Sequence, residues 1–250
     1  MPTAEDHQLA ARLAHEAGEL LLRLRDELAS QDAVPARIKD EGDRRSHEWL
    51  MGELRSERPE DAVLSEEARA DERNDARRLR AARVWIIDPL DGTREYGEGR
   101  ADWAVHVALV EDGTPTVGAV ALPAEGIVLS TAEVPEVPAA GDPLRVVVSR
   151  SRPPEEATRI AHSLRAELVE MGSAGAKAMS ILLGRSDVYP HSGGQFEWDS
   201  AAPVAVATAA GLHCSRLDGS ELVYNRVDSY LPDLLICRPE HASAVIGASS

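Results

Sequence analysis

Cysteine is scarce in this sequence: Cys214 and Cys237 are the only two among 250 residues. They do not stand in a spacing typical of a metal site, and a cytosolic chain keeps such thiols reduced. A structural disulfide is therefore the less favoured interpretation.

Positive charge is also in short supply. Lys and Arg total 27 against 43 Asp and Glu, which gives a formal net charge of −16 and a pI near 4.9. This balance opposes a nucleic-acid surface, because phosphate backbones are bound by clustered basic side chains. An anionic substrate would need a bound divalent cation, which reverses the sign that the surrounding carboxylates create.

Long apolar runs are missing as well. No uninterrupted apolar stretch reaches the roughly 18 residues that span a bilayer. The start of the chain, residues 1–6, is acidic and lacks the basic and apolar regions of a signal peptide. We therefore expect a cytoplasmic protein with no membrane partner. The apolar fraction of 43% is ordinary for a globular protein, and the length fits one large domain or two small ones.

The first half of the chain predicts two helices followed by an antiparallel sheet. Apolar residues from Leu9 to Leu28 fall on one helical stripe, and Thr3 with Asp6 resembles a capping box at its start. A second helix is expected over residues 44–56. The expected strands are Ala62–Ser65, Arg83–Ile87, Trp103–Val110, Thr116–Leu122 and Gly126–Thr131.

A proline-rich segment without periodicity, residues 133–143, separates this half from an alternating pattern of strands and helices. We place a boundary near residue 140, which divides the chain into residues 1–140 and 141–250. The elements expected in the second half are strand 144–149, a helix after Pro154, strand 167–171, a helix ending at Gly184, strand 187–189, a helix from Asp199 to Gly211, a strand pair around Asp218-Gly219 and strand 234–237.

Two carboxylates stand three residues apart, at Asp88 and Asp91, in an expected turn from strand to helix. Mg²⁺ takes oxygen ligands, and the Leu90 carbonyl could be a third ligand beside them. A helix beginning at Gly92-Thr93 would direct free amides toward a phosphate. An Asp-rich turn that solvates itself is the alternative interpretation.

Further acids stand beside apolar residues elsewhere, at Glu66 and Asp199, where burial would be costly unless they are paired or bind metal. The alternative for Asp199 is a favourable charge at a helix start. Thr93 hydrogen-bonded to Asp43 could orient a metal-bound water whose pKa the metal lowers. Asp43 could equally be the N-cap of the following helix.

Taken together, the segments Trp85–Thr93, Ser65-Glu66-Glu67 and Trp198-Asp199 resemble the inositol monophosphatase superfamily, in which W-I-I-D-P-x-D-G-T, a preceding G/S-E-E and a late W-D recur in this order. The resemblance covers nearly the whole chain. It implies an αβαβα layered sandwich of the inositol monophosphatase and sugar phosphatase type, an α+β or α/β fold with its metals between the halves.

The same resemblance implies roles for the acidic residues. It assigns two or three Mg²⁺ ions to a site whose ligands are Glu66, Asp88, the Leu90 carbonyl, Asp91 and Asp199. It also implies that Asp43 and Thr93, with Glu66, carry the attack of the water. Phosphate binding falls to Asp91, Gly92 and Thr93, and lithium inhibition is a further expectation.

Within the superfamily, the pattern is similar to the CysQ-type 3′(2′),5′-bisphosphate nucleotidases, on the strength of Asp91–Tyr96, Gly172–Met179 and Glu197-Trp198-Asp199. Lys177 is one of two lysines in the chain, which suggests a specific contact. The substrate-binding candidates are Arg150, Ser151, Arg152, Ser173, Lys177, His191 and Glu197. The sequence departs from the branch at Arg152, where relatives often have histidine, and at His191, where some have arginine; either residue could be a solvated surface group instead.

The leading hypothesis is therefore Mg²⁺-dependent hydrolysis of the 3′-phosphate of 3′-phosphoadenosine 5′-phosphate, or of its 5′-phosphosulfate analogue, in sulfate assimilation. A phosphatase for inositol 1-phosphate or fructose 1,6-bisphosphate is the alternative with the same metal chemistry. A module that binds metal or inositides without turnover is a third hypothesis. The expected partner is a small phosphorylated molecule, and a homodimer is compatible with this class.

Overall fold

The computed structural model describes residues 1–249 and, within them, every side chain except that of Asp71. Two long helices open the chain, α1 (Ala4–Ser30) and α2 (Pro35–Glu57). The expected capping box is confirmed, because Asp6 N–H donates to the Thr3 hydroxyl and Thr3 N–H donates to the Asp6 carboxylate. Among the described residues, no helix is both long and apolar enough to cross a membrane.

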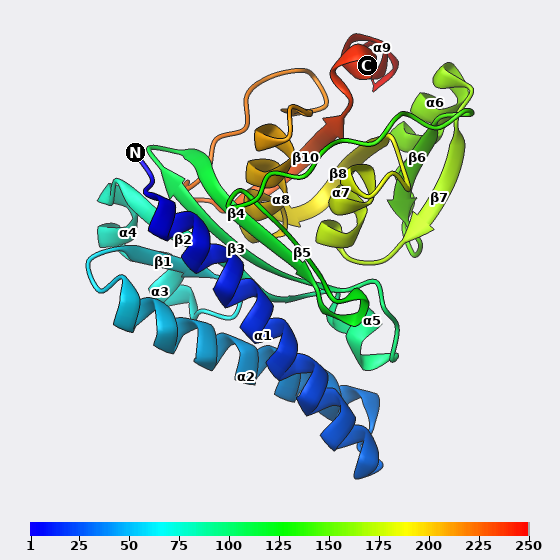
Figure 1. The fold of residues 1–250 in the computed structure, drawn as a ribbon. Coiled ribbons are helices and arrows are strands. Elements are labelled where there is room, and N and C mark those ends of the chain that lie inside the picture. The colour runs from blue at the N-terminus through cyan, green and yellow to red at the C-terminus, as the bar shows by residue number, and fades with distance from the viewer. Residues whose placement is uncertain (250) are drawn as a thin grey trace.

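The first sheet follows these helices in the chain and lies against them (Figure 1). Its strands run in the order β1-β2-β3-β4-β5, with β1 parallel to β2 and the other neighbours antiparallel. Alternate residues of β2 face opposite sides: Trp85 and Ile87 pack on α1 and α2, whereas Val84 and Ile86 enter the central core. The strands are β1 (Ala62–Ser65), β2 (Arg83–Asp91), β3 (Ala104–Glu111), β4 (Thr114–Leu122) and β5 (Ile127–Ser130).

The second sheet has the strand order β7-β6-β8-β10-β9. Helices α7 (Ala174–Leu182) and α8 (Glu197–Ala209) lie between the two sheets, and α6 (Glu155–Leu164) and α9 (Ala242–Ser249) cover the outer face (Figure 1). The layers therefore give the expected αβαβα sandwich. The strands are β6 (Arg145–Ser149), β7 (Glu167–Met171), β8 (Val188–Phe196), β9 (His213–Ser215) and β10 (Tyr230–Cys237).

Helix α2 begins nine residues earlier than the sequence pattern indicated, with Pro35 in its first turn. Gly42 lies inside this helix at a packing position: a Cβ there would lie 2.8 Å from the Tyr96 ring and 2.9 Å from a Leu90 methyl. Asp43 therefore lies inside α2, and its interpretation as a helix N-cap is wrong. The glycine lets α2 approach the turn that follows β2.

The strand pair expected around Asp218-Gly219 is also wrong. Residues 216–229, all of which the structure describes, contain no strand, and β9 pairs instead with β10. Asp218 accepts hydrogen bonds from the N–H and hydroxyl of Ser220, so the segment is a local turn in a long loop. The sequence pattern also missed short helical segments, α3 (Ala70–Arg73), α4 (Ala76–Arg80), η1 (Pro123–Glu125) and η2 (Pro239–His241), and helix α9.

Candidate active site

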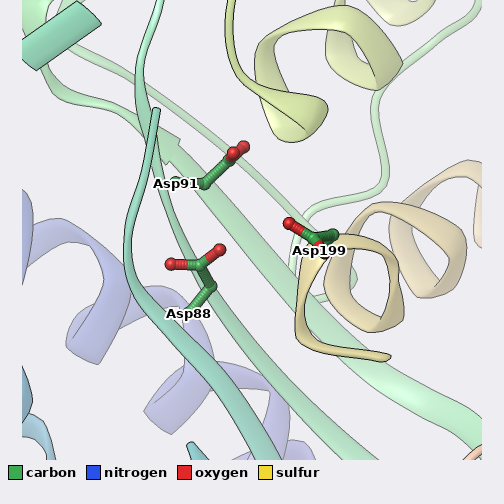
Figure 2. Close-up of side chains that lie close together, drawn as sticks. All are labelled: Asp88, Asp91 and Asp199. Carbon is green, nitrogen blue, oxygen red and sulfur yellow. The ribbon is translucent and has the colours of Figure 1, made fainter. Parts of the chain in front are cut away.

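Three carboxylates from two elements converge between the layers. Asp88 and Asp91 end β2, Asp199 lies in the first turn of α8, and one carboxylate oxygen from each lies within 4.8 Å of the others (Figure 2). Residues three apart on a regular strand point to opposite faces. The β2–β3 pairing is irregular between Asp88 and Asp91, and this bulge lets both side chains turn toward α8.

Glu66 joins this group from the turn after β1. Because β1 is parallel to β2 with Ser65 opposite Ile87, the next residue, Glu66, comes beside Asp88. The two carboxyl groups share a hydrogen bond. Burial, and then the charge of Glu66, raise the pKa of Asp88 well above its usual value, and burial raises the pKa of Glu66 to about 7. This pair therefore favours a bound proton or cation.

Asp91 has a different environment, because it faces the start of α7. Its Oδ2 accepts from the Ser173 hydroxyl at 2.5 Å and from Gly175 N–H at 2.6 Å, and Oδ1 accepts from Ala174 N–H at 3.0 Å. His106 Nε2 lies 3.2 Å from Oδ2. Burial raises the pKa of Asp91, but these donors, His106 first, outweigh it and hold that pKa below its usual range. Asp91 is therefore charged at neutral pH.

Asp199 combines two roles that the sequence left as alternatives. Its Oδ2 accepts from Phe196 N–H at 2.6 Å, as a residue in the first turn of α8 does when it caps the helix. The same carboxylate belongs to the cluster with Asp91. Burial, and then the charge of Asp91, raise the pKa of Asp199 to about 7.

Thr93 and Asp43 form the expected pair across two helices, α5 (Thr93–Gly97) and α2. The Thr93 hydroxyl lies 3.2 Å from Asp43 Oδ1 and 3.1 Å from the Leu90 carbonyl. Burial, and then the charge of Glu67, raise the pKa of Asp43 to about 7. Gly92, before α5, has φ of +86°, a left-handed conformation that favours glycine.

The donor set fits a divalent cation. Among the described side chains, no Lys or Arg pairs with the carboxylates of Asp88, Glu66 or Asp199, although Asp88 is buried and the other two are half-buried. Buried carboxylates are costly without a partner, and oxygen ligands of this kind suit hard cations such as Mg²⁺. The chemistry of the cluster therefore supports metal binding.

Lys177 lies beside the acidic cluster, and His191 lies near Lys177. Lys177 Nζ donates to the carbonyls of Ser173, at 2.6 Å, and Gly172, at 3.2 Å, and lies 5.6 Å from the Tyr189 ring centroid. Burial lowers the pKa of Lys177 although the charge of Asp91 opposes it. His191 Nε2 lies 3.0 Å from the Gly193 carbonyl; burial, and then the charge of Lys177, lower the pKa of His191 to about 4.

The remaining basic candidates follow β6 and differ in their partners. Arg150 is paired with two acids, donating to Glu95 at 2.7 Å and to Glu98 at 2.7 Å. The Arg152 side chain is exposed and forms no ion pair with the described side chains, and its charge contributes to the lowered pKa of His191. Ser151 is also exposed. Arg152 is thus the arginine here that is available to an anionic ligand.

Glu197 is buried and contacts the loop of residues 222–229. Its carboxylate accepts from Asn225 N–H at 2.7 Å and from Arg226 N–H at 2.8 Å. Arg78 holds the other side of the same loop, because it donates to the Asn225 side chain and the Arg226 carbonyl. The two half-chains are therefore joined here, close to Asp199.

His106 was absent from the sequence-based candidates. It occupies β3 in a run of apolar residues, is fully buried and lies between Asp91 and the Trp198 carbonyl. The one available signal was a polar residue at a position where the strand pattern requires burial. Its role depends on contacts with residues from β2 and α8, which the local sequence does not contain.

The comparisons with known proteins agree with this geometry. Residues 4–245 match the inositol monophosphatase family. The 3′-phosphoadenosine 5′-phosphate phosphatase of Mycobacterium leprae is 50% identical over 97% of this chain and 92% of its own length. The 3′(2′),5′-bisphosphate nucleotidase CysQ of Escherichia coli is 31% identical over 88% of this chain and 94% of its own.

The solved structure of CysQ from Bacteroides thetaiotaomicron has 28% identity and a TM-score of 0.75, covering 94% of this chain and 97% of that one. The family match over residues 4–245 includes every element that carries the acidic cluster. The chain therefore belongs to the inositol monophosphatase family and is similar in pattern to its CysQ-type branch.

Proposed function

We propose that this protein is a Mg²⁺-dependent phosphatase that removes the 3′-phosphate of 3′-phosphoadenosine 5′-phosphate, giving AMP and phosphate. The 5′-phosphosulfate analogue is a second substrate of the same kind. The observation that carries the proposal is the buried Lys177 ammonium, which hydrogen-bonds to the Ser173 carbonyl at the start of α7, where Asp91 is also bound. Lys177 and Arg152 both lie near enough to His191 for their charges to lower its pKa. The half-identical phosphatase of Mycobacterium leprae, named for the same substrate, supports it.

The acidic cluster would hold the metal ions. Glu66, Asp88 and the Leu90 carbonyl form one group of ligands, and Asp88, Asp91 and Asp199 form the other. When bound, Mg²⁺ would neutralise phosphate charge and lower the pKa of the attacking water. Asp88 belongs to both groups, so it is the residue whose charge matters most.

The Thr93 hydroxyl is the group placed to orient the water. Its proton is directed to Asp43 and the Leu90 carbonyl, which leaves its lone pairs to accept a hydrogen bond from the nucleophile. The first amides of α5, at Gly92 and Thr93, lack partners within the helix and would bind phosphate oxygens. The hydroxyl therefore positions a water, and no covalent enzyme intermediate is required.

The basic residues would receive the second phosphate. The buried Lys177 ammonium uses two of its three donors on backbone carbonyls, so one donor is left for a ligand. Arg152 is exposed and could pair bidentately with a phosphate or sulfate group. Ser151 and His191 complete the proposed substrate site. Arg150 is paired with Glu95 and Glu98, Glu197 is bound to the 222–229 loop, and the Ser173 hydroxyl is bound to Asp91, so these three residues would support the site without contacting the substrate. A substrate with a single phosphate would leave this basic group without a partner.

The test is phosphate release in Mg²⁺ from three substrates side by side: 3′-phosphoadenosine 5′-phosphate, inositol 1-phosphate and fructose 1,6-bisphosphate. We expect kcat/KM for the nucleotide to exceed both others by about tenfold or more, which corresponds to about 1.4 kcal/mol. A preference for either sugar phosphate would contradict the proposal, and tight Mg²⁺ binding without phosphate release would favour a non-catalytic module.

The enzyme should have four further properties that its substrate and metal do not by themselves determine. We expect inhibition by lithium, a cytoplasmic location, a role in removing a by-product of sulfate assimilation, and a homodimer. Repeating the phosphate-release assay in LiCl checks the first, and sedimentation of the purified chain checks the last. Neither outcome changes the identity of the substrate.

A further inference from the structure

The His106 imidazole contacts both elements that carry the acidic cluster, β2 through Asp91 and α8 through the Trp198 carbonyl. Nδ1 lies 3.0 Å from the Trp198 carbonyl, in the first turn of α8, and Nε2 lies 3.2 Å from Asp91 Oδ2. A carbonyl oxygen only accepts, so Nδ1 is a donor, and Nε2 can donate to a carboxylate only when the ring carries its second proton. Nε2 has no well-aligned hydrogen bond to any described residue, and the Asp91 carboxylate is the group it faces. One ring therefore connects β2 to α8.

The contacts of Asp91 explain why this connection matters. Oδ2 accepts hydrogen bonds from the Ser173 hydroxyl and Gly175 N–H and faces the His106 ring, whereas Oδ1 accepts only from Ala174 N–H among the described groups. A carboxylate oxygen has about two lone-pair sites. Oδ2 is thus fully engaged by the protein, and Oδ1 is the oxygen that remains available to a cation.

Gly175 gives independent support. A Cβ on this residue would lie 2.1 Å from His106 Nε2. Gly175 is not among the residues with positive φ, so its backbone does not require glycine. The glycine is needed to leave room for the imidazole. The start of α7 is therefore shaped around the ring.

We propose that His106 is a positioning residue of the metal centre, which sets the orientation of Asp91 and its separation from the first turn of α8. This inference rests on the metal ligands of the proposed function, Asp91 and Asp199. Groups that orient a ligand from behind typically change metal affinity by about 10- to 100-fold when removed. His106 thus acts on the metal through Asp91 and has no contact with substrate.

Two substitutions separate the contacts of the ring. His106→Asn keeps a donor near the position of Nδ1 and loses the contact with Asp91, whereas His106→Gln keeps a donor near the position of Nε2. The measurement is calorimetric titration of Mg²⁺ into each protein without substrate, with His162→Gln on an exposed helix position as the matched control. Thermal unfolding without metal reports whether each variant folds.

We expect His106→Asn to weaken Mg²⁺ binding at least about tenfold and His106→Gln to stay within about threefold of the parent. Equal or tighter Mg²⁺ binding by His106→Asn would overturn the inference. Tighter binding would mean that the ring acts only through its positive charge, which repels the cation. Equal weakening by both variants would also overturn it, since the ring would then be structural support alone.

Gly175→Ala provides a second route, because it displaces the ring while keeping both His106 and the Gly175 amide. Gly175→Ala should weaken Mg²⁺ binding. Adding it to His106→Asn should change little, because the shorter asparagine side chain does not reach the new Cβ at position 175. Fully additive effects would contradict the inference. None of these titrations contains a nucleotide, so their failure is distinct from failure of the substrate assay.

Discussion

The Thr93 hydroxyl lies 3.2 Å from the Asp43 carboxylate, although the two residues are 50 positions apart and belong to different helices. Gly42 makes this contact possible, because any larger residue there would collide with Tyr96 and Leu90. The pair is held by the packing of α2 against α5, and this rigidity is what water positioning requires.

Replacing Thr93 with Val should lower kcat by about 100-fold or more while KM changes little, because the hydroxyl acts on the nucleophile. Thr93→Ser keeps the hydroxyl and should retain most activity. Steady-state phosphate release measures both variants. If Thr93→Val kept more than half of the parent kcat, the hydroxyl would have no part in the reaction.

Asp88→Asn should abolish turnover, since it removes charge from a side chain in both proposed groups of ligands. The fold should survive, because burial, and then the charge of Glu66, already raise the pKa of Asp88 and favour an uncharged side chain there in the metal-free protein. Thermal unfolding with and without Mg²⁺ should show that the metal no longer stabilises this variant. The exposed neighbour Glu67, changed to Gln, is the control; a Mg²⁺ shift that persisted in Asp88→Asn would refute the ligand assignment.

Mg²⁺ binding should release protons near neutral pH. Burial raises the pKa values of Glu66 and Asp199 to about 7, so these groups hold protons at pH 6 in the metal-free protein. A metal needs the carboxylates, so its apparent affinity should rise from pH 6 to 8 and then level off. Calorimetry in two buffers with different ionisation enthalpies counts the protons; no release at pH 6 would contradict the raised pKa values.

Urea unfolding gives the same prediction a second measurement. Between about pH 4 and 7 the folded, metal-free protein holds more protons on Glu66 and Asp199 than the unfolded chain does. The contribution of these groups to stability therefore falls as pH rises through this window. Added Mg²⁺ should restore more stability at pH 8 than at pH 6, and the free energies of unfolding at the two pH values measure the difference.

Much of this site could be read from the sequence because its ligands occur in short linear segments. Asp88 and Asp91 lie at the end of β2, and Glu66 follows its parallel neighbour β1, so the local pattern places all three acids near strand ends. The layered fold was predictable for the same reason, since the strands and helices of both halves have strong periodicity.

The parts that could not be predicted depend on contacts between distant residues. Asp43 had the pattern of a helix N-cap, but it lies inside α2, where Gly42 allows close packing on Tyr96 and Leu90. Arg150 had the appearance of a free anion-binding group, but Glu95 and Glu98 neutralise it. His106 acquires its role only when β3 meets α8. Such pairings are set by tertiary packing, which no local window contains.

Lys177→Met should discriminate between nucleotides with one and with two phosphates. Because the Lys177 ammonium is buried beside Ser173 and His191, its loss should weaken binding of the bisphosphate substrate and raise its KM by about tenfold or more. A nucleotide that lacks the 5′-phosphate, adenosine 3′-monophosphate, should show a much smaller change. Lys39→Met, at the only other lysine, is the control. An equal increase in KM for both nucleotides would mean that Lys177 supports the fold and does not bind the second phosphate.

Glu197→Gln should act on stability more than on substrate affinity. The Glu197 carboxylate accepts from two backbone N–H groups of the loop, at Asn225 and Arg226, and the amide can replace only one of these bonds. Losing one bond to a charged acceptor costs about 2 kcal/mol, which lowers the unfolding temperature of a chain of this size by about 4–8 °C. We expect KM for the nucleotide to stay within about twofold.

The two possible roles of Glu197, in stability and in substrate binding, differ in whether the unfolding temperature or KM changes. Differential scanning calorimetry and initial rates on the same preparation report unfolding temperature and KM together. A raised KM with an unchanged unfolding temperature would place Glu197 in contact with the substrate. A lowered unfolding temperature with unchanged KM would mean that Glu197 serves the site from a distance, because the loop it anchors is held to the first turn of α8, where Asp199 lies.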